Sequence, residues 1–163
     1  MTPFNHREPG MIGGVFTNDD LYGEIICDLV HVHPMAVKSL VLCKGADKAL
    51  IITDCMRAGG LPDGEYKLGE MMVKVVGSIA RTAKEDALAG STTTMADCVR
   101  NMHRVVGVPL ADAVKMATAS PANAIGLINE TGTLDVGKRA DIIAVDEDFN
   151  VKFVMVNGEI KLQ

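Results

Sequence analysis

Apolar runs and amphipathic segments follow one another along the first third of the chain. Tyr22–Val32 is rich in Ile, Val and Cys, which predicts a strand. Pro34 opens a helical segment that Gly45 closes, because Pro is tolerated in a first turn and Gly is favoured just past the last one. Ala49–Thr53 is the next apolar run. This order predicts a βαβ unit with parallel strands.

The remaining pattern is more varied. Residues 1–20 contain several Pro and Gly residues and are expected to be irregular. The dipeptide Asn157-Gly158 between two apolar runs predicts a tight hairpin. The other expected elements are short antiparallel strands within Glu65–Thr82, helices over Ser91–Val106, from Leu110 and from Pro121 to Gly126, and strands over Ala140–Val145, Val151–Val156 and Glu159–Leu162.

Composition narrows the class of protein. The formal charge of −5 and the scarcity of aromatic residues argue against a nucleic-acid partner. No apolar stretch has membrane-spanning length, and no signal peptide opens the chain. The four cysteines form no C-x-x-C pair, so they are interpreted as buried, reduced thiols of a cytoplasmic protein.

Asp54 is the first candidate for chemistry. It follows the apolar run Ala49–Thr53 and precedes a loop rich in Gly. In α/β barrels a polar residue at the carboxyl end of a strand faces the active-site mouth, where a carboxylate can move a proton or approach a metal. The alternative is that Asp54 caps the following turn, as Asp often does.

Three further segments carry polar groups of interest. His31 and His33 are two residues apart and would share one face of a strand, which suits a metal. The alternative is one functional His beside one turn His. Arg7 lies in a loop-like segment and could bind phosphate or carboxylate, or could pair with Glu8 on the surface. Gly90-Ser91 precedes a helix, which is either a polar-group site or ordinary capping.

Together these segments resemble a known family. The motifs that carry the resemblance are, in chain order, Asn5-His6-Arg7-Glu8-Pro9-Gly10, Asp28-Leu29-Val30-His31-Val32-His33-Pro34, Thr53-Asp54, Leu88-Ala89-Gly90-Ser91-Thr92-Thr93-Thr94-Met95 and Ala119-Ser120-Pro121-Ala122, with Gly137-Lys138-Arg139-Ala140-Asp141-Ile142 in the tail. The chain is similar along its whole length to N-acetylglucosamine-6-phosphate deacetylases of the amidohydrolase superfamily. Only the tail is common to the superfamily at large.

The resemblance implies a fold and a set of partners. The fold would be α/β, the C-terminal portion of a (β/α)8 metallo-dependent hydrolase barrel plus a small β-sandwich domain. Residues 1–126 would be the incomplete barrel, with a β insertion at about 65–82, and residues 127–163 the sandwich strands. A missing N-terminal half would carry the ligands of a divalent metal, zinc or iron, and none is expected in this chain alone. The isolated chain would associate with itself or with that half.

The resemblance also implies roles. Asp54 would be the catalytic residue, taking a proton from the metal-bound water and passing it to the leaving amine of a phosphorylated amino sugar. Arg7 would bind the phosphate. The remaining substrate-contacting residues would be Asp28, Leu29, Val30, His31, Leu88, Ala89 and Gly90.

One position departs from the family pattern. Leu29 stands where the family usually has Gly, a residue that permits close approach of the backbone to a ligand, so Leu29 could crowd the sugar. Two alternatives therefore remain for the function: a non-catalytic remnant that acts in folding or oligomerisation, and another amidohydrolase such as a dihydroorotase-like enzyme.

Overall fold

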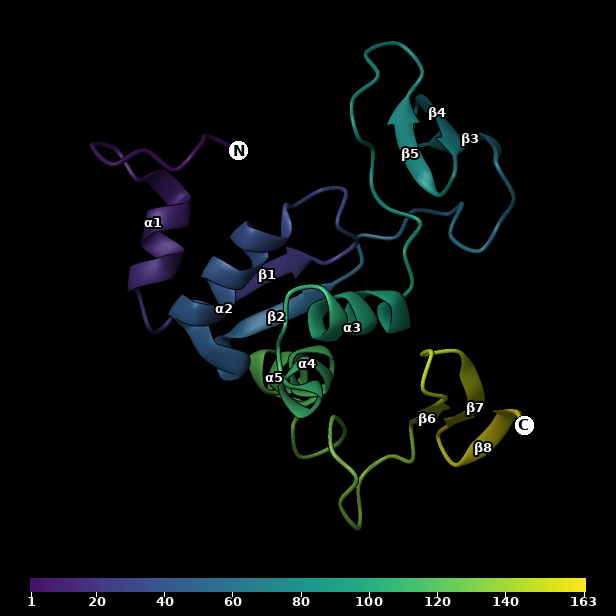
Figure 1. The fold of residues 1–163 in the computed structure, drawn as a ribbon. Helices are drawn as coiled ribbons and strands as arrows, with labels where there is room; N and C mark the ends of the chain where they lie inside the picture. Colours follow the sequence, from purple (N-terminus) through teal and green to yellow (C-terminus); the bar gives the residue numbers. More distant parts are fainter.

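The computed structural model describes residues 1–163 and contains three separate small sheets with helices around the first (Figure 1). The helices are α1 (Gly10–Thr17), α2 (Pro34–Lys48), α3 (Met95–Arg104), α4 (Leu110–Ala117) and α5 (Ala119–Ala124). The strands are β1 (Gly23–Ile26), β2 (Ala49–Ile52), β3 (Gly64–Leu68), β4 (Met71–Val76), β5 (Ile79–Thr82), β6 (Ile142–Val145), β7 (Val151–Val156) and β8 (Glu159–Leu162).

The predicted βαβ unit is confirmed. Strands β1 and β2 pair in parallel, with Ile26 opposite Ile52, and α2 connects them. Gly45 breaks α2 with a φ of 63°, and one further helical turn leads into β2. Gly is suited to that break because a positive φ costs it little.

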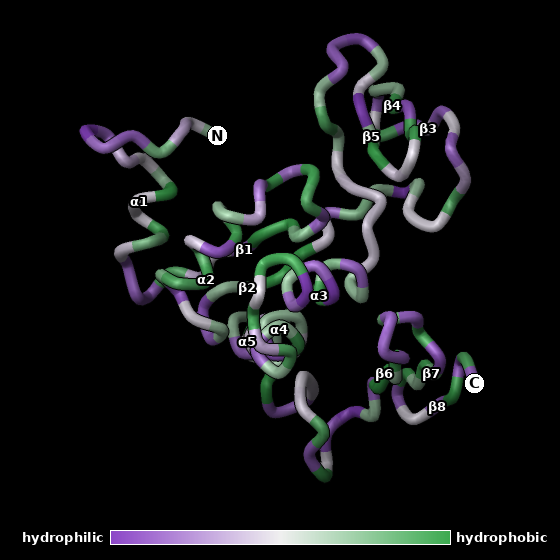
Figure 2. Tube along the Cα trace, viewed as in Figure 1, coloured by the Kyte–Doolittle hydropathy of each residue, from purple (hydrophilic) through white to green (hydrophobic).

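The main core lies between this parallel pair and helices α2, α3 and α4. Ile51 of β2, Val37 of α2, Met102 of α3 and Met116 of α4 are almost fully buried there. Figure 2 shows the hydrophobic residues along β1 and β2 and the hydrophilic loop that precedes α1. The side chains of the apolar runs that predicted the strands therefore meet those of the amphipathic helices.

The predicted antiparallel segments are also confirmed. Strands β3, β4 and β5 form one meander, with its own small core around Val73, Val75 and Ala80. Strands β6, β7 and β8 form another, and Asn157 and Gly158 both have positive φ in the turn before β8, as the hairpin requires.

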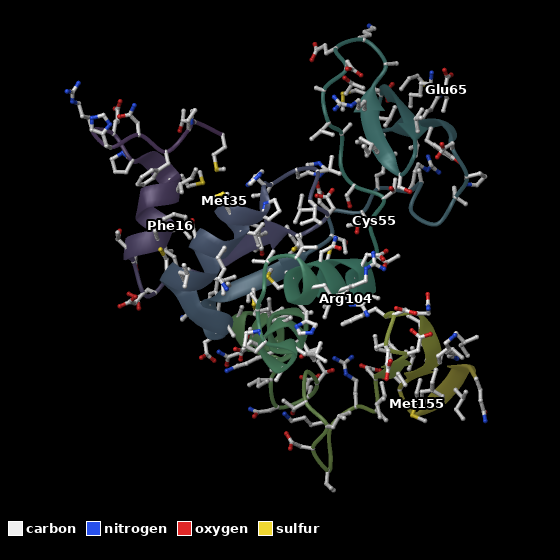
Figure 3. The ribbon with its side chains drawn as sticks, viewed as in Figure 1. Phe16, Met35, Cys55, Glu65, Arg104 and Met155 are labelled. Carbon is white, nitrogen blue, oxygen red and sulfur yellow. The ribbon has the colours of Figure 1, made fainter.

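These two antiparallel sheets do not form a single sandwich in this chain, because they lie on different sides of the helical part (Figure 1). The β6–β8 sheet is joined to α3 through the turn that precedes β7. Arg104 at the end of α3 donates to the carbonyl of Glu147 and lies over the ring of Phe149 (Figure 3). Phe149 in turn packs against the main core.

Three expectations were wrong. The first is that residues 1–20 are irregular: Gly10–Thr17 is a helix, whose Val15 and Phe16 pack on the main core. The second is the length of the first strand, which ends at Ile26 rather than Val32 because the chain turns at Asp28. The third concerns the cysteines, treated below. No helix combines the length and the apolarity needed to cross a bilayer.

The chain exposes much more surface than a compact protein of its size. Its accessible area is 10337 Å² for 17.3 kDa, whereas a compact monomer of that mass would expose about 7,800 Å². The exposed apolar residues include Ile143, Ile160 and Leu162 of the last sheet and Met35 and Leu42 of α2. Both the extended shape and these residues leave apolar surface in contact with water.

The cysteines divide into two pairs, and all four are free. Cys27 and Cys98 are buried in the main core, as expected, but Cys43 and Cys55 are exposed. Cys43 lies on the outer side of α2, and Cys55 lies in the loop after β2. Burial raises the pKa of the Cys27 thiol to about 12 and also raises the pKa of the Cys98 thiol.

This division predicts the reactivity of the thiols. Because the thiolate is the reactive form, a disulfide reagent at neutral pH should label Cys43 and Cys55 rapidly and Cys27 and Cys98 only on unfolding. Mass spectrometry after a short exposure should detect two labels, rising to four in denaturant. The double variant Cys43→Ser/Cys55→Ser should take up none in the folded state, and rapid labelling of that variant would contradict the buried placement of the other pair.

Candidate functional site

The candidate site lies at the carboxyl ends of β1 and β2. Because these strands are parallel and Ile26 is opposite Ile52, the segments after them leave the sheet at the same edge. Asp28 follows β1 and Asp54 follows β2. The two carboxylates thus follow adjacent parallel strands.

Asp54 lies at a strained point of the backbone. Its φ is 46°, in the left-handed region that non-Gly residues seldom adopt. Its carboxylate is exposed and has no hydrogen bond or ion pair within the chain. The alternative that Asp54 caps a turn is therefore wrong, and the carboxylate is free to act on a bound molecule.

A third segment joins this edge of the sheet. The N–H of Ser91 donates to the carbonyl of Asp54 at 2.8 Å, and the carbonyl of Ser91 accepts from the N–H of Met56 at 2.8 Å. The Ser91 hydroxyl also donates to the carbonyl of Thr53. Ser91 thus pairs in parallel with Cys55, which Figure 3 labels where the chain passes from the helical part toward the β3–β5 sheet.

Gly90 is required by this pairing. Its φ is 65°, and a Cβ at this position would lie 3.2 Å from the carbonyl oxygen of Asp54. The two residues before it connect to the neighbouring sheet: Ala89 donates its N–H to the carbonyl of Ala80 at 3.1 Å, and Leu88 bridges to Arg81. Segment 88–91 therefore passes directly beside Asp54, as a substrate-contacting segment would.

The turn after β1 is organised by Asp28. Its Oδ1 accepts the N–H groups of Val30 and His31, both at 2.9 Å, and its Oδ2 lies 2.7 Å from Nδ1 of His31. Burial by itself would raise the pKa of Asp28, but these hydrogen bonds and the neighbouring imidazole hold that pKa below its usual value. Asp28 therefore fixes the orientation of the His31 ring.

The Nε2 atom of His31 is the part of this pair open to a ligand. It has no partner within the chain, and no buried side-chain nitrogen or oxygen in the structure lacks one, so Nε2 contacts solvent. A ring with one nitrogen fixed and the other free can donate or accept one hydrogen bond in a set direction.

Leu29 has a positive φ of 67°, a conformation that suits Gly better than Leu. Its side chain packs against the main core rather than standing free. Val30 next to it is exposed. The positive φ gives one physical reason why Gly would suit this position, and the crowding of a sugar by Leu29 stays a prediction.

The two histidines do not form a metal pair. Neither lies in a strand, because β1 ends at Ile26. His33 is the N-cap of α2, and its Nδ1 accepts the N–H of Met35 at 3.2 Å. No group of three or more His, Cys, Asp or Glu side chains gathers anywhere in the chain. The residues present do not fit a divalent metal.

Arg7 is not brought to this edge. It lies in the exposed loop before α1, which projects from the rest of the chain (Figure 1). Its backbone N–H donates to Oδ1 of Asn5 at 3.0 Å, and its guanidinium forms no ion pair, with Glu8 or with any other residue. The surface pairing proposed as the alternative is absent, so the guanidinium is available to an anion.

Sequence reasoning missed one residue of this region. Asn101 on α3 donates from Nδ2 to the carbonyl of Cys27 at 3.0 Å, at the base of the Asp28 turn. The two residues are 74 positions apart in the chain. Only the packing of α3 on the parallel strands brings them together, and no local pattern could indicate it.

Comparison with known proteins places the chain among amidohydrolases. The model of the amidohydrolase family matches residues 20–161. A protein of Escherichia coli K12, provisionally named N-acetylgalactosamine-6-phosphate deacetylase, is 41% identical over 98% of this chain and 95% of its own length. The N-acetylglucosamine-6-phosphate deacetylase of Lysinibacillus sphaericus is 41% identical over the whole of this chain and 42% of its own length.

The fold is found in solved structures as well. A mutant N-acetyl-D-glucosamine-6-phosphate deacetylase from Mycobacterium smegmatis, crystallised with N-acetyl-D-glucosamine-6-phosphate, superposes on all of this chain with a TM-score of 0.95 at 36% identity. The match covers 43% of that protein. The chain thus spans about two fifths of the Lysinibacillus and Mycobacterium proteins and nearly all of the Escherichia coli one. The sequence match, the relatives and the superposition agree: the chain belongs to the amidohydrolase family.

Proposed function

We propose that this chain is the part of an N-acetylhexosamine-6-phosphate deacetylase that supplies the acid–base group and part of the sugar site. The observation that carries the proposal is the convergence of Asp54, segment 88–91 and the Asp28–His31 turn on one edge of a parallel sheet. The chemistry is hydrolysis of an acetamide. Water adds to the carbonyl carbon, the C–N bond breaks, and the amine leaves with a proton.

Each group has a defined task in this reaction. Asp54 takes the proton from the attacking water and returns it to the leaving nitrogen, as a positioned general acid–base does. His31, oriented by Asp28, forms a hydrogen bond with the sugar through Nε2, either as donor or as acceptor. The backbone of residues 88–90 lies against the sugar, and Gly90 lets this segment approach the Asp54 carbonyl closely.

Two components of the reaction are absent from this edge of the sheet. The family generally depends on a divalent metal, zinc or iron by the resemblance, and this chain offers no ligand set for one. No step is therefore assigned to a metal. The loop before α1, which carries Arg7, lies apart from the end of β2 (Figure 1), so a contact of Arg7 with the 6-phosphate requires a neighbouring copy or another polypeptide beside the sheet.

The large accessible area supports association of this kind. The excess over a compact monomer is about 2,500 Å², which is more than the roughly 800 Å² that each partner contributes to a standard interface. The same observation favours the second candidate, a non-catalytic part that acts in folding or oligomerisation. The two candidates differ in whether the Asp54 edge performs chemistry once the remaining surface is covered.

A separate question is whether the substrate is the glucosamine or the galactosamine derivative. Relatives at 41% identity are named for galactosamine in one case and for glucosamine in another. We take the glucosamine derivative as the first candidate, because the solved Mycobacterium smegmatis relative binds it. Assaying both 6-phosphates separates these two.

Asp54→Asn tests the acid–base role. The variant is placed in a chimera in which this chain replaces the aligned 42% of the Lysinibacillus sphaericus deacetylase. Asn is nearly isosteric but cannot take up and release a proton, so kcat should fall about 10²–10⁴-fold while sugar-phosphate binding persists. Acetate release and calorimetric titration measure the two quantities.

The control for Asp54→Asn is Asp63→Asn, which lies in an exposed loop outside the site and should leave turnover within a few-fold of the parent. If the parent chimera folds but releases no acetate from either epimer, the non-catalytic candidate is favoured. Turnover unaffected by Asp54→Asn would remove that residue from the chemistry.

Arg7→Ala tests the phosphate contact in the same chimera. A bidentate, charge-assisted contact is directional, so its loss should reduce kcat/KM for the phosphorylated sugar far more than for unphosphorylated N-acetylglucosamine. Arg7→Lys should restore only part of the loss, because an ammonium lacks the planar fork. Equal and small losses for both sugars would show that Arg7 does not touch the phosphate.

A further inference from the structure

The Asp28–His31 turn has no regular structure of its own to hold it. Strand β1 ends at Ile26, and α2 begins at Pro34. Asp28 ties the turn to itself, through Val30 and His31. These bonds set the shape of the turn but do not fix it to the rest of the protein, so its position depends on contacts from elsewhere.

The first such contact comes from α3. Asn101 donates from Nδ2 to the carbonyl of Cys27 at 3.0 Å. Cys27 is fully buried and lies between the end of β1 and the turn. A buried carbonyl keeps its position only while it has a donor, because leaving it unpaired is unfavourable. Asn101 therefore holds the residue from which the turn departs.

The second contact is the side chain of Leu29. Its left-handed backbone is unfavourable for a bulky residue and persists only where the surroundings compensate. The compensation here is packing of the Leu29 side chain against the main core. The turn is thus held at its base by a hydrogen bond and at its second residue by apolar contact.

The group that this arrangement aims is the His31 ring. Asp28 holds Nδ1 at 2.7 Å, and Nε2 faces solvent. A shift of the turn would move Nε2 with it, since Asp28 of the same turn holds the ring. Small displacements of a positioned group are costly to recognition.

We propose that Asn101 and Leu29 are positioning residues, which fix the Asp28–His31 turn to the core and so aim Nε2 of His31 at the sugar. The positioning is a property of this chain. Its use for a sugar rests on the proposed function. A Gly at this position would have no side chain to hold the turn, whereas the side chain of Leu29 packs against the core.

Hydrogen exchange in the full chain tests the positioning independently of any enzymatic activity. Asn101→Leu keeps the approximate volume of the side chain and removes the donor. The amide protons of Val30 and His31 should then exchange about tenfold faster, the effect of losing roughly one hydrogen bond's worth of local stability. The Nδ1 proton signal of His31, seen by NMR in histidine-labelled protein, should broaden or vanish.

Two controls separate positioning from general loosening of α3. His103 lies on the same helix, and its Nδ1 is 2.9 Å from the carbonyl of Val108, so its ring signal should stay unchanged. Asn123→Leu removes a surface amide contact to Tyr22 and should alter neither histidine. Equal acceleration throughout α3, or unchanged exchange at Val30 and His31, would overturn the role of Asn101.

Leu29→Gly keeps the proposal testable if Asn101→Leu fails to fold. Gly relieves the backbone strain, so the variant should fold, yet the turn should lose its apolar anchor and exchange faster at Val30 and His31. Unchanged or slower exchange would overturn the anchoring role of Leu29.

A final titration keeps the two proposals distinct. N-acetylglucosamine 6-phosphate is added to the chimera while the His31 ring signal is followed. A shift in the parent that requires a several-fold higher sugar concentration in Leu29→Gly supports the aiming of His31. No shift in the parent would count against the proposed function, and the exchange data would still decide whether Asn101 and Leu29 position the turn.

Discussion

The backbone pairing of Ser91 with Asp54 and Met56 is the interaction on which the candidate site depends. Two hydrogen bonds of 2.8 Å attach the segment that leads into α3 beside the end of β2. Without it, Asp54 would end a strand in an open loop. With it, Asp54 lies between the turn after β1 and the segment before α3, and Gly90 is confined to a conformation that no larger residue adopts easily.

Two of the six non-glycine residues with positive φ, Leu29 and Asp54, lie at the same edge. Leu29, Asp54 and Gly90 all have positive φ, and all lie where segments leave or join the carboxyl end of the parallel pair. Strained residues persist only where surrounding contacts outweigh their cost. Here the compensating contacts are the core packing of Leu29 and the hydrogen bond that the Asp54 carbonyl accepts.

The rest of the chain leaves many apolar residues exposed. The main core is closed by α2, α3 and α4, but the β6–β8 sheet has exposed apolar residues and is joined to that core chiefly through Phe149 and Arg104. Most residues of its three strands are exposed. The chain spans 42% of the Lysinibacillus sphaericus deacetylase and 95% of the Escherichia coli K12 protein.

The amino-acid sequence by itself determined most local structure and the chemistry of single residues. Continuous apolar runs gave β2 and the parallel pair, and Asn157-Gly158 gave the last hairpin, because strand burial and turn geometry depend on neighbouring residues. Asp54 could likewise be chosen from its place after a buried strand. The helix Gly10–Thr17 was missed because its three glycines disfavour a helix, and only packing of Val15 and Phe16 on the core offsets that cost.

Tertiary structure alone decided how these residues are used. It separated His31 from His33 by ending β1 early, left Cys43 and Cys55 in solvent, and placed Ser91 beside Asp54. It also brought Asn101 to a carbonyl 74 residues away. Such pairings depend on how helices pack over a sheet, which involves residues distant in the chain. A pattern of neighbours therefore predicts the elements but not their contacts.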